Sequence, residues 1–162
     1  MNALKYISLV LAIILLGGPL ASCAKRALTE QNMKNGKKLA AGIVLYNRLQ
    51  YKGGLPKTLS DLAATGVLKE IPQCECADGK MRDFIYVTGW DQTISGYAVL
   101  ASPPEMDSKV TIVVYMDLSA KVLSRQEAEG EIEKSRAFAA SIRKMEEEAT
   151  PKATSSSNTL NR

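Results

Sequence analysis

Residues 29–50 carry apolar side chains at intervals of three and four positions, which is the pattern of one buried helix face. Leu39 and Ile43 lie near the centre of this face. Gly36 and Gly42 fall on or near it and lower the intrinsic helicity by up to ~1 kcal/mol each. Packing must therefore hold the helix, and the two glycines would permit a sheet to approach closely.

Three stretches rich in β-branched and aromatic residues follow, beginning at Phe84, Gly96 and Val110. A turn at 117–120 leads from the third stretch into a short last strand at 121–124. These hairpin connections predict a mostly antiparallel sheet. In the third stretch one alternating set is the better core face, and its members are Val110, Ile112, Val114 and Met116.

Two capping boxes mark further helix starts. Thr58 and Asp61 have this spacing at the start of a short helix, and Ser124 and Glu127 have it at the start of a longer one, 125–149. The longer helix has a narrow apolar stripe, so it either docks on the domain or pairs with a partner helix, and its acidic runs face water. The predicted fold is α+β: an N-terminal helix packed on a small antiparallel sheet of three to four strands, followed by a C-terminal amphipathic helix.

Residues 1–22 are typical of a secretory signal peptide. Lys5 supplies a positive charge, 7–16 is an apolar run, and the Gly-Gly-Pro at 17–19 is expected to break any helix. The chain has 162 residues, 46% of them hydrophobic, which allows one modest domain with appendages. The Ser/Thr-rich tail 150–162 has too little apolar surface to order itself.

An aliphatic residue, two small residues and a cysteine end the leader segment, and Leu20-Ala21-Ser22-Cys23 resembles the lipobox of bacterial lipoproteins. The resemblance implies cleavage between Ser22 and Cys23, a diacylglyceryl group on the Cys23 thiol and, usually, acylation of the new amino terminus. Two or three chains would anchor the protein stably, because each buried CH2 group contributes roughly 0.8 kcal/mol. Residues 23–28 would form a short lipidated linker.

The lipobox resemblance predicts a lipid-anchored protein of the bacterial cell envelope, held to the membrane through Cys23. Ala24 stands where an inner-membrane retention signal would place Asp, so the periplasmic face of the outer membrane is favoured over the inner membrane. The alternative is an uncleaved signal anchor, although the apolar and small residues of 6–21 fall short of the roughly 20 needed to span a bilayer.

The net charge is +4, and five basic residues follow the lipobox closely: Lys25, Arg26, Lys34, Lys37 and Lys38. They either attract an anionic membrane surface or form a solvated helix face. Nucleic acid is not an expected partner, because an exported protein does not meet it and the basic residues are not interleaved with aromatics.

Cys74 and Cys76 flank Glu75 in a segment that export would expose to oxidation. A Cys-x-Cys disulfide closes a small, strained ring. Four possibilities stay open: a local disulfide, free thiols, intermolecular pairing and a metal site. The metal site has weak support, because the chain contains no His and only carboxylates such as Glu75 and Asp78 could complete a shell. We predict no cofactor.

The order of the segments supports a second resemblance. "LPKTLSDLAATGVLKEIPQ" (55–73) precedes the first two strand segments, and "VTIVVYMDLSAKVLS" (110–124) is similar to a hairpin with an Asp-Gly turn between two strands. Residues 29–124 therefore resemble the globular domain of type II secretion pseudopilins and their type IV pilin-like relatives. In that family a long helix packs on a small antiparallel sheet.

The sequence departs from this family in its turn and its leader. Leu118 replaces the turn glycine, and the lipobox stands where pilin-like proteins have a cleavage motif leading into an apolar helix. The major secretion pseudopilin binds calcium in its sheet loops. The comparable loop, 102–108, offers only Glu105 and Asp107 as weak calcium candidates, whereas calcium takes about 6 to 8 oxygens.

An enzyme is not predicted, because the chain has no His for a general base and no phosphate-binding or nucleophile-elbow motif. Asp78 and Asp83 are more simply solvated acids, and Trp90 and Asp91 fit a hairpin turn better than a stacking site. We therefore predict a lipid-anchored, non-enzymatic interaction module with an unidentified protein partner in the envelope. The alternatives are an accessory component of a secretion or pilus-type machine and, third, a small-ligand binder or enzyme.

Overall fold

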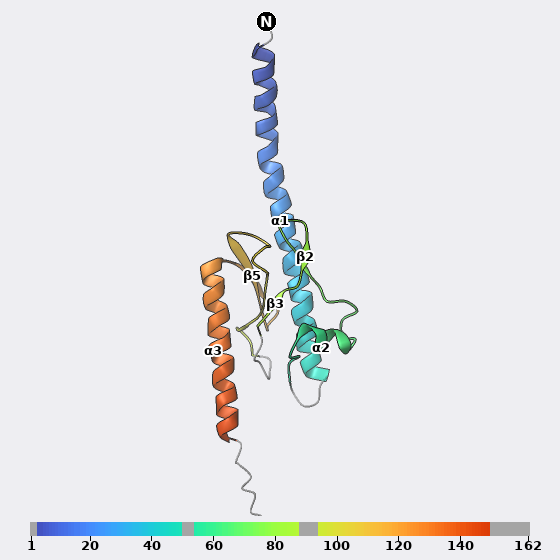
Figure 1. Cartoon of the computed structure of the whole chain (residues 1–162), viewed down its shortest axis with the longest axis vertical. Coiled ribbons are helices and arrows are strands. Elements are labelled where there is room, and N and C mark those ends of the chain that lie inside the picture. Colours follow the sequence, from blue (N-terminus) through green and yellow to red (C-terminus); the bar gives the residue numbers. More distant parts are fainter. Residues whose placement is uncertain (1–2, 50–53, 88–93, 150–162) are drawn as a thin grey trace, which may run out of the picture.

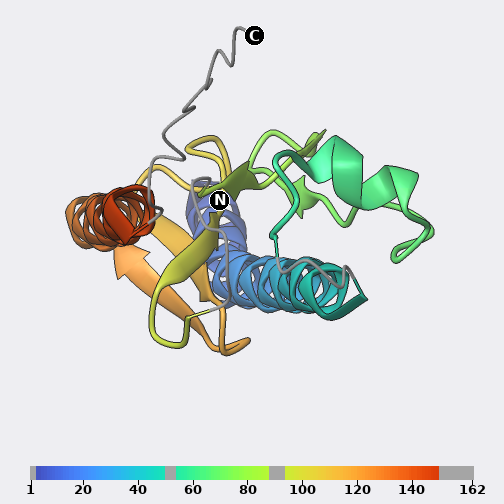
Figure 2. The same ribbon diagram turned by 90° about the horizontal axis from the view of Figure 1, so that it is seen from below.

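Two helices lie on opposite faces of a four-stranded antiparallel sheet (Figures 1 and 2). The computed structural model describes residues 3–49, 54–87 and 94–149. The sheet has the order β3-β4-β5-β6, and β1 and β2 form a separate two-stranded sheet. The elements are α1 (Ala3–Leu49), α2 (Leu59–Ala64), β1 (Cys74–Glu75), β2 (Met81–Arg82), β3 (Ile85–Tyr86), β4 (Ala98–Ala101), β5 (Val110–Tyr115), β6 (Ala120–Ser124) and α3 (Arg125–Ala149). The predicted α+β fold is confirmed.

Both faces of β5 are buried. Ile112 and Val114 belong to the larger hydrophobic cluster, which they share with the buried face of α1. Val113 and Tyr115 pack in a second cluster with Ala128 of α3. The predicted core face does meet α1, but the prediction was incomplete, because the opposite face of the strand is also covered.

The helix α3 docks on the sheet, which settles one choice that the sequence left open. Ser135 ties the two elements together: its hydroxyl accepts from the Ala98 amide at 2.9 Å and donates to the Glu131 carbonyl at 2.8 Å. Farther along α3, the ring of Phe138 stacks on Tyr97 with centroids 4.2 Å apart. The apolar stripe of α3 is thus used within the chain.

The helix α1 is longer than predicted. It runs without interruption from Ala3 to Leu49, so the expected break at 17–19 was wrong, and the segment 23–28, predicted to be a lipidated linker, is helical. Proline removes one main-chain hydrogen bond and can kink a helix without ending it. Residues 23–28 include alanine, lysine, arginine and leucine, which are strong helix formers and continue the helix into the domain.

Both predicted capping boxes are present. The Thr58 hydroxyl accepts from the Asp61 amide, and the Asp61 carboxylate accepts from the Thr58 amide. At the start of α3, the Glu127 carboxylate accepts from the Ser124 amide at 2.9 Å, and the Ser124 hydroxyl accepts from the Glu127 amide at 3.3 Å. These local bonds set the starts of α2 and α3.

The small sheet of β1 and β2 was not predicted, because two-residue strands carry no readable periodicity. The fully buried Asn32 of α1 holds β1 in place. Its amide nitrogen donates to the Glu75 carbonyl and its amide oxygen accepts from the Glu75 amide, each at 2.8 Å. Asn35 donates to the Gln73 carbonyl, also at 2.8 Å. The helix thereby satisfies main-chain groups that a neighbouring strand would otherwise pair.

The two glycines of α1 permit close approaches to different elements. A Cβ atom on Gly36 would lie 2.8 Å from a methyl group of Val114 and 3.2 Å from the Phe84 ring, so the predicted approach of a sheet is confirmed there. A Cβ atom on Gly42 would lie 2.6 Å from Leu68, which follows α2 and does not belong to the sheet.

We expect Gly36→Ala to lower the free energy of unfolding by ~1–3 kcal/mol, because crowding against a β-branched core residue outweighs the gain of up to ~1 kcal/mol in helix propensity. Gly130→Ala in α3 is the matched control, because a Cβ atom there meets nothing within 4 Å. That change should raise stability by ~0.5–1 kcal/mol. Urea unfolding measures both, and stabilisation by both would contradict the close contact.

Leu118 has a positive φ of 66°, unlike every other non-glycine residue that the structure describes. It occupies the β5–β6 turn, where the hairpin that it resembles has glycine. We expect Leu118→Gly to raise the free energy of unfolding by ~0.5–1 kcal/mol, because glycine adopts this conformation without strain. Leu118→Ala keeps the strained backbone conformation, so we expect no increase in stability when this variant is unfolded by heat. Equal stability of the two variants would contradict this account.

Candidate functional site

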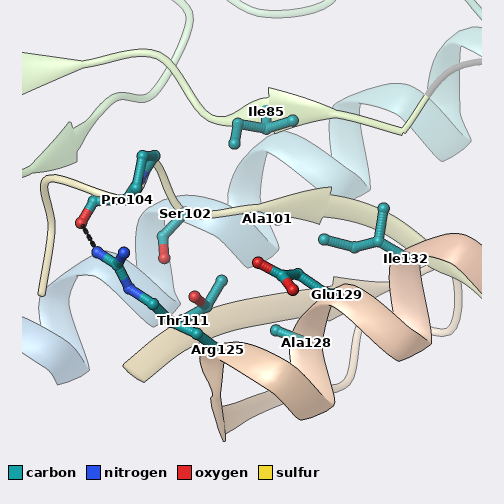
Figure 3. A pocket seen from close by; sticks show the side chains of 9 residues that line it. All are labelled: Ile85, Ala101, Ser102, Pro104, Thr111, Arg125, Ala128, Glu129 and Ile132. Atoms are coloured by element: carbon teal, nitrogen blue, oxygen red, sulfur yellow. Dashed lines mark hydrogen bonds between the residues drawn. The ribbon is translucent and has the colours of Figure 1, made fainter. Parts of the chain in front are cut away.

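A hollow lies between the sheet and the first two turns of α3 (Figure 3). Its volume is ≈ 210 Å³. Strands β3, β4 and β5, the loop after β4 and the helix all contribute side chains to its wall. These are Ile85, Ala101, Ser102, Pro104, Thr111, Arg125, Ala128, Glu129 and Ile132. We call this the α3 hollow.

The apolar part of the α3 hollow comes from the sheet and from one face of the helix. Ala101 and Ala128 are buried, and their short side chains leave the space open. Ile85 and Ile132 lie across it from β3 and α3 (Figure 3). Ile85 is 39% exposed although it is a large aliphatic residue. The hollow therefore presents apolar surface to solvent.

Polar groups converge on the same space. Ser102 is 1% exposed and points into the hollow, where its oxygen accepts from the Ile112 amide at 2.9 Å (Figure 3). The Thr111 hydroxyl and the Glu129 carboxylate also point into it. Neither has a hydrogen bond or ion pair with any residue that the structure describes. The site is suited to binding a small molecule with both polar and apolar parts.

Arg125 stands at one end of the α3 hollow. Its Nη2 atom donates to the carbonyl of Pro104 at 2.6 Å and to that of Asp107 at 3.2 Å. The capping box fixes the helix turn that carries Arg125, and hydrogen bonding from Ser124 holds the pKa of the Glu127 carboxyl below its ordinary value. The guanidinium is therefore held in position and still has unused donors.

No residue of the α3 hollow was singled out from the sequence. Ser102 and Thr111 lie in ordinary strand segments, and Glu129 belongs to a run of acids expected to face water. Their shared position depends on the docking angle of α3, which leaves no local trace in the sequence. The small side chains of Ala101 and Ala128 are consistent with unfilled space. Alanine is too common in helices and strands, however, for these two residues to predict a hollow.

Of the two weak calcium candidates, Asp107 has other partners for its carboxylate. Asp107 accepts from the Lys25 ammonium at 2.7 Å and from the Lys109 amide at 2.7 Å. The bond from Lys25 is the main cause that lowers the pKa of the Asp107 carboxyl. Glu105 uses its main-chain carbonyl to accept from the Ala77 amide at 3.2 Å. In the described parts of the chain, no group of three or more acidic or cysteine residues could hold a metal ion.

The Lys25–Asp107 ion pair borders a second hollow of ≈ 450 Å³, which lies between residues 24–29 of α1 and the loop before β5. Leu28 and Met106 contribute apolar atoms to it, and Glu75 contributes a third charged group. Its charges are of both signs and largely paired, so it has no clear preference for a cation or an anion.

The predicted lipidation residue Cys23 is exposed, with the sulfur available for modification. Ser22, on the other side of the predicted cleavage point, has its side chain outside the described residues, as do Trp90, Asp91 and the tail 150–162. The predictions that concern these residues therefore stay predictions.

The solvated acids of the β1–β2 region each have a partner. Arg82 donates to both carboxylate oxygens of Asp78, at 2.9 and 2.8 Å, and these bonds hold the pKa of that carboxyl well below its ordinary value. Asp83 accepts from the side chain of Gln73 at 2.9 Å. The two acids do not share a proton or a ligand in this arrangement.

Comparison of the chain with known protein families, with curated proteins and with solved structures finds no match. In the part of the chain that the structure describes, no helix has the length and apolar character needed to cross a membrane.

Cys74 and Cys76 are free thiols in the structure, 0% and 1% exposed within the larger hydrophobic cluster. Burial, with smaller effects from Cys76 and Glu75, raises the pKa of the Cys74 thiol to about 12. Such a thiol is a poor nucleophile, because the thiolate is the reactive form. This arrangement corresponds to the free-thiol possibility.

We expect iodoacetamide at neutral pH to leave both core thiols of a Cys23→Ala protein unmodified in the folded state. In denaturant without reductant, both thiols should react. The intact mass of the protein then gives the number of carbamidomethyl groups added. Absence of reaction in denaturant, reversed by adding a reductant, would show a disulfide and contradict the structure.

Proposed function

We propose that this chain is a lipid-anchored protein of the bacterial cell envelope whose α+β domain acts as a non-enzymatic interaction module. The observation that carries the proposal is the position of Cys23, whose exposed sulfur lies at the start of the helical segment that enters the core. Residues 23–27 are all exposed, which leaves the side chains of this segment accessible to an enzyme that attaches lipid.

After cleavage, α1 would connect the lipid directly to the domain. Leu28, the first partly buried residue after Cys23, lies about 8 Å along the helix at a rise of ~1.5 Å per residue. The Lys25–Asp107 pair joins this segment to the loop before β5. The domain would therefore rest close to the membrane at a defined distance, without a flexible tether.

Most of the basic residues near the lipobox are better explained as a solvated helix face than as a membrane contact. Lys34 lies about 16 Å along α1 from Cys23, which exceeds the screening length of ~8 Å at physiological salt. It also pairs with Glu30 at 3.3 Å. Only Arg26 combines nearness to the anchor with the lack of an ion pair to a described residue.

The opposite end of α1 offers a surface for a protein partner. Leu45 and Leu49 are one helical turn apart and are 45% and 59% exposed. At ~1.5 Å per residue, Leu49 lies about 40 Å from Cys23 along the helix axis, so a membrane anchor at one end would leave this end accessible. These two side chains offer a protein partner an apolar contact at this end of the helix.

The second candidate is an accessory component of a secretion or pilus-type machine. A long N-terminal helix on an antiparallel four-stranded sheet supports it, as does the β5–β6 turn, where Leu118 adopts the glycine-like φ of 66°. Photo-crosslinking from position 49 in the native host distinguishes the candidates. Capture of pilin-like subunits favours the second, and capture of other envelope proteins favours the first.

Intact-mass measurement of the membrane-extracted protein tests the anchor. We expect loss of residues 1–22 and added acyl mass in the wild type, and no acyl mass in Cys23→Ala. Fractionation should place the acylated protein in the outer membrane. A full-length product with an unmodified Cys23 thiol would contradict the proposal, whatever the partner.

A further inference from the structure

Arg125 and Glu129 are one turn apart on α3 and carry opposite charges, yet they do not form an ion pair in the structure. The guanidinium turns away to the carbonyls of Pro104 and Asp107. The Glu129 carboxylate points into the α3 hollow from the helix, toward Ala101 (Figure 3). The two charges therefore stand apart at the rim of a single hollow.

Two hydroxyl groups lie between these charges. The buried Ser102 oxygen already accepts from the Ile112 amide, and its own proton has no acceptor among the described residues. Within the hollow, this proton can be donated to a water molecule or to an acceptor atom of a ligand. Thr111 presents a second unused hydroxyl on the adjacent strand (Figure 3).

The remaining wall is apolar, and the space that it borders suits a small occupant. Ile85 and Ile132 line the hollow across from the polar groups, over a floor of buried alanines. The volume of ≈ 210 Å³ corresponds to about seven water molecules at ~30 Å³ each. A ligand of this size has only a few non-hydrogen atoms, so its polar groups must be close together.

We propose that the α3 hollow binds a small apolar α-amino acid in its zwitterionic form. The ligand carboxylate accepts hydrogen bonds from Ser102, Thr111 and a free N–H of Arg125. The ligand ammonium pairs with Glu129. An aliphatic side chain the size of that of valine contacts Ile85 and Ile132. This inference does not rest on the lipid anchor.

The experiment measures binding of L-valine, N-acetyl-L-valine and L-valinamide to the full chain by isothermal titration and by NMR shifts of residues in the hollow. The acetylated probe lacks the ammonium group, and the amide lacks the carboxylate. We expect saturable binding of L-valine and at least about 10-fold weaker binding of each derivative, because each loses a charged hydrogen-bonding partner.

Glu129→Gln should weaken L-valine binding by about 10-fold and should not weaken the binding of N-acetyl-L-valine, which has no ammonium group to pair with Glu129. Glu133→Gln is the matched control, since it removes an exposed charge one turn along α3 that does not line the hollow. Thr111→Val, which keeps the side-chain shape, should weaken the binding of L-valine, because it removes one donor to the ligand carboxylate.

Three results would overturn the proposal. The first is a lack of saturable L-valine shifts in the hollow. The second is equal affinity for the three probes, which would show that the charges do not recognise the ligand. The third is an equal effect of the two glutamate variants, which would reduce the role of Glu129 to a general change in surface charge.

Discussion

Burial of both faces of the central strand is the constraint on which the rest of the structure depends. β5 carries apolar residues on each side, and a single helix covers only one of them. The chain meets this requirement by returning along the second face as α3, directly after the capping box at Ser124. The result is three layers, α1, sheet and α3, formed by a short chain with a limited number of large apolar residues.

The same arrangement creates the α3 hollow. A straight helix can follow only part of a twisted sheet, and α3 packs against β4, β5 and β6. Toward β3 the hollow is lined by the alanines at 101 and 128, whose side chains are too short to fill the space. The hollow is therefore a consequence of covering the second face with one helix. The packing of α3 does not explain why the hollow is lined by polar residues, because apolar residues at these positions would pack equally well.

On the other side of the sheet, α1 has two roles in the fold, and the proposed lipid anchor would add a third. Its glycine at position 36 lets the helix approach β5, its buried Asn32 replaces a neighbouring strand for β1, and its first turns after Cys23 would lead to the lipid. Because one rigid element carries all three, the distance between membrane and sheet would be set by helix length. The exposed leucines near its far end would then be held away from the lipid surface.

Local sequence patterns were enough to predict the helix at 29–50, the order of the main strands and both capping boxes, because each depends on residues a few positions apart. The candidate lipidation at Cys23 also comes from the sequence alone, since a lipobox is a contiguous motif, and it stays a prediction. The sequence patterns predicted a helix break at 17–19 that is absent and did not predict that 23–28 are helical. Helix-forming residues on both sides continue the main-chain hydrogen bonds of α1 through these segments. What only the tertiary structure decided was the burial of Cys74 and Cys76, the pairing of Asp107 with Lys25, and the meeting of Ser102, Thr111, Arg125 and Glu129 around one hollow. These depend on how distant segments pack, and packing geometry has no period or motif along the chain.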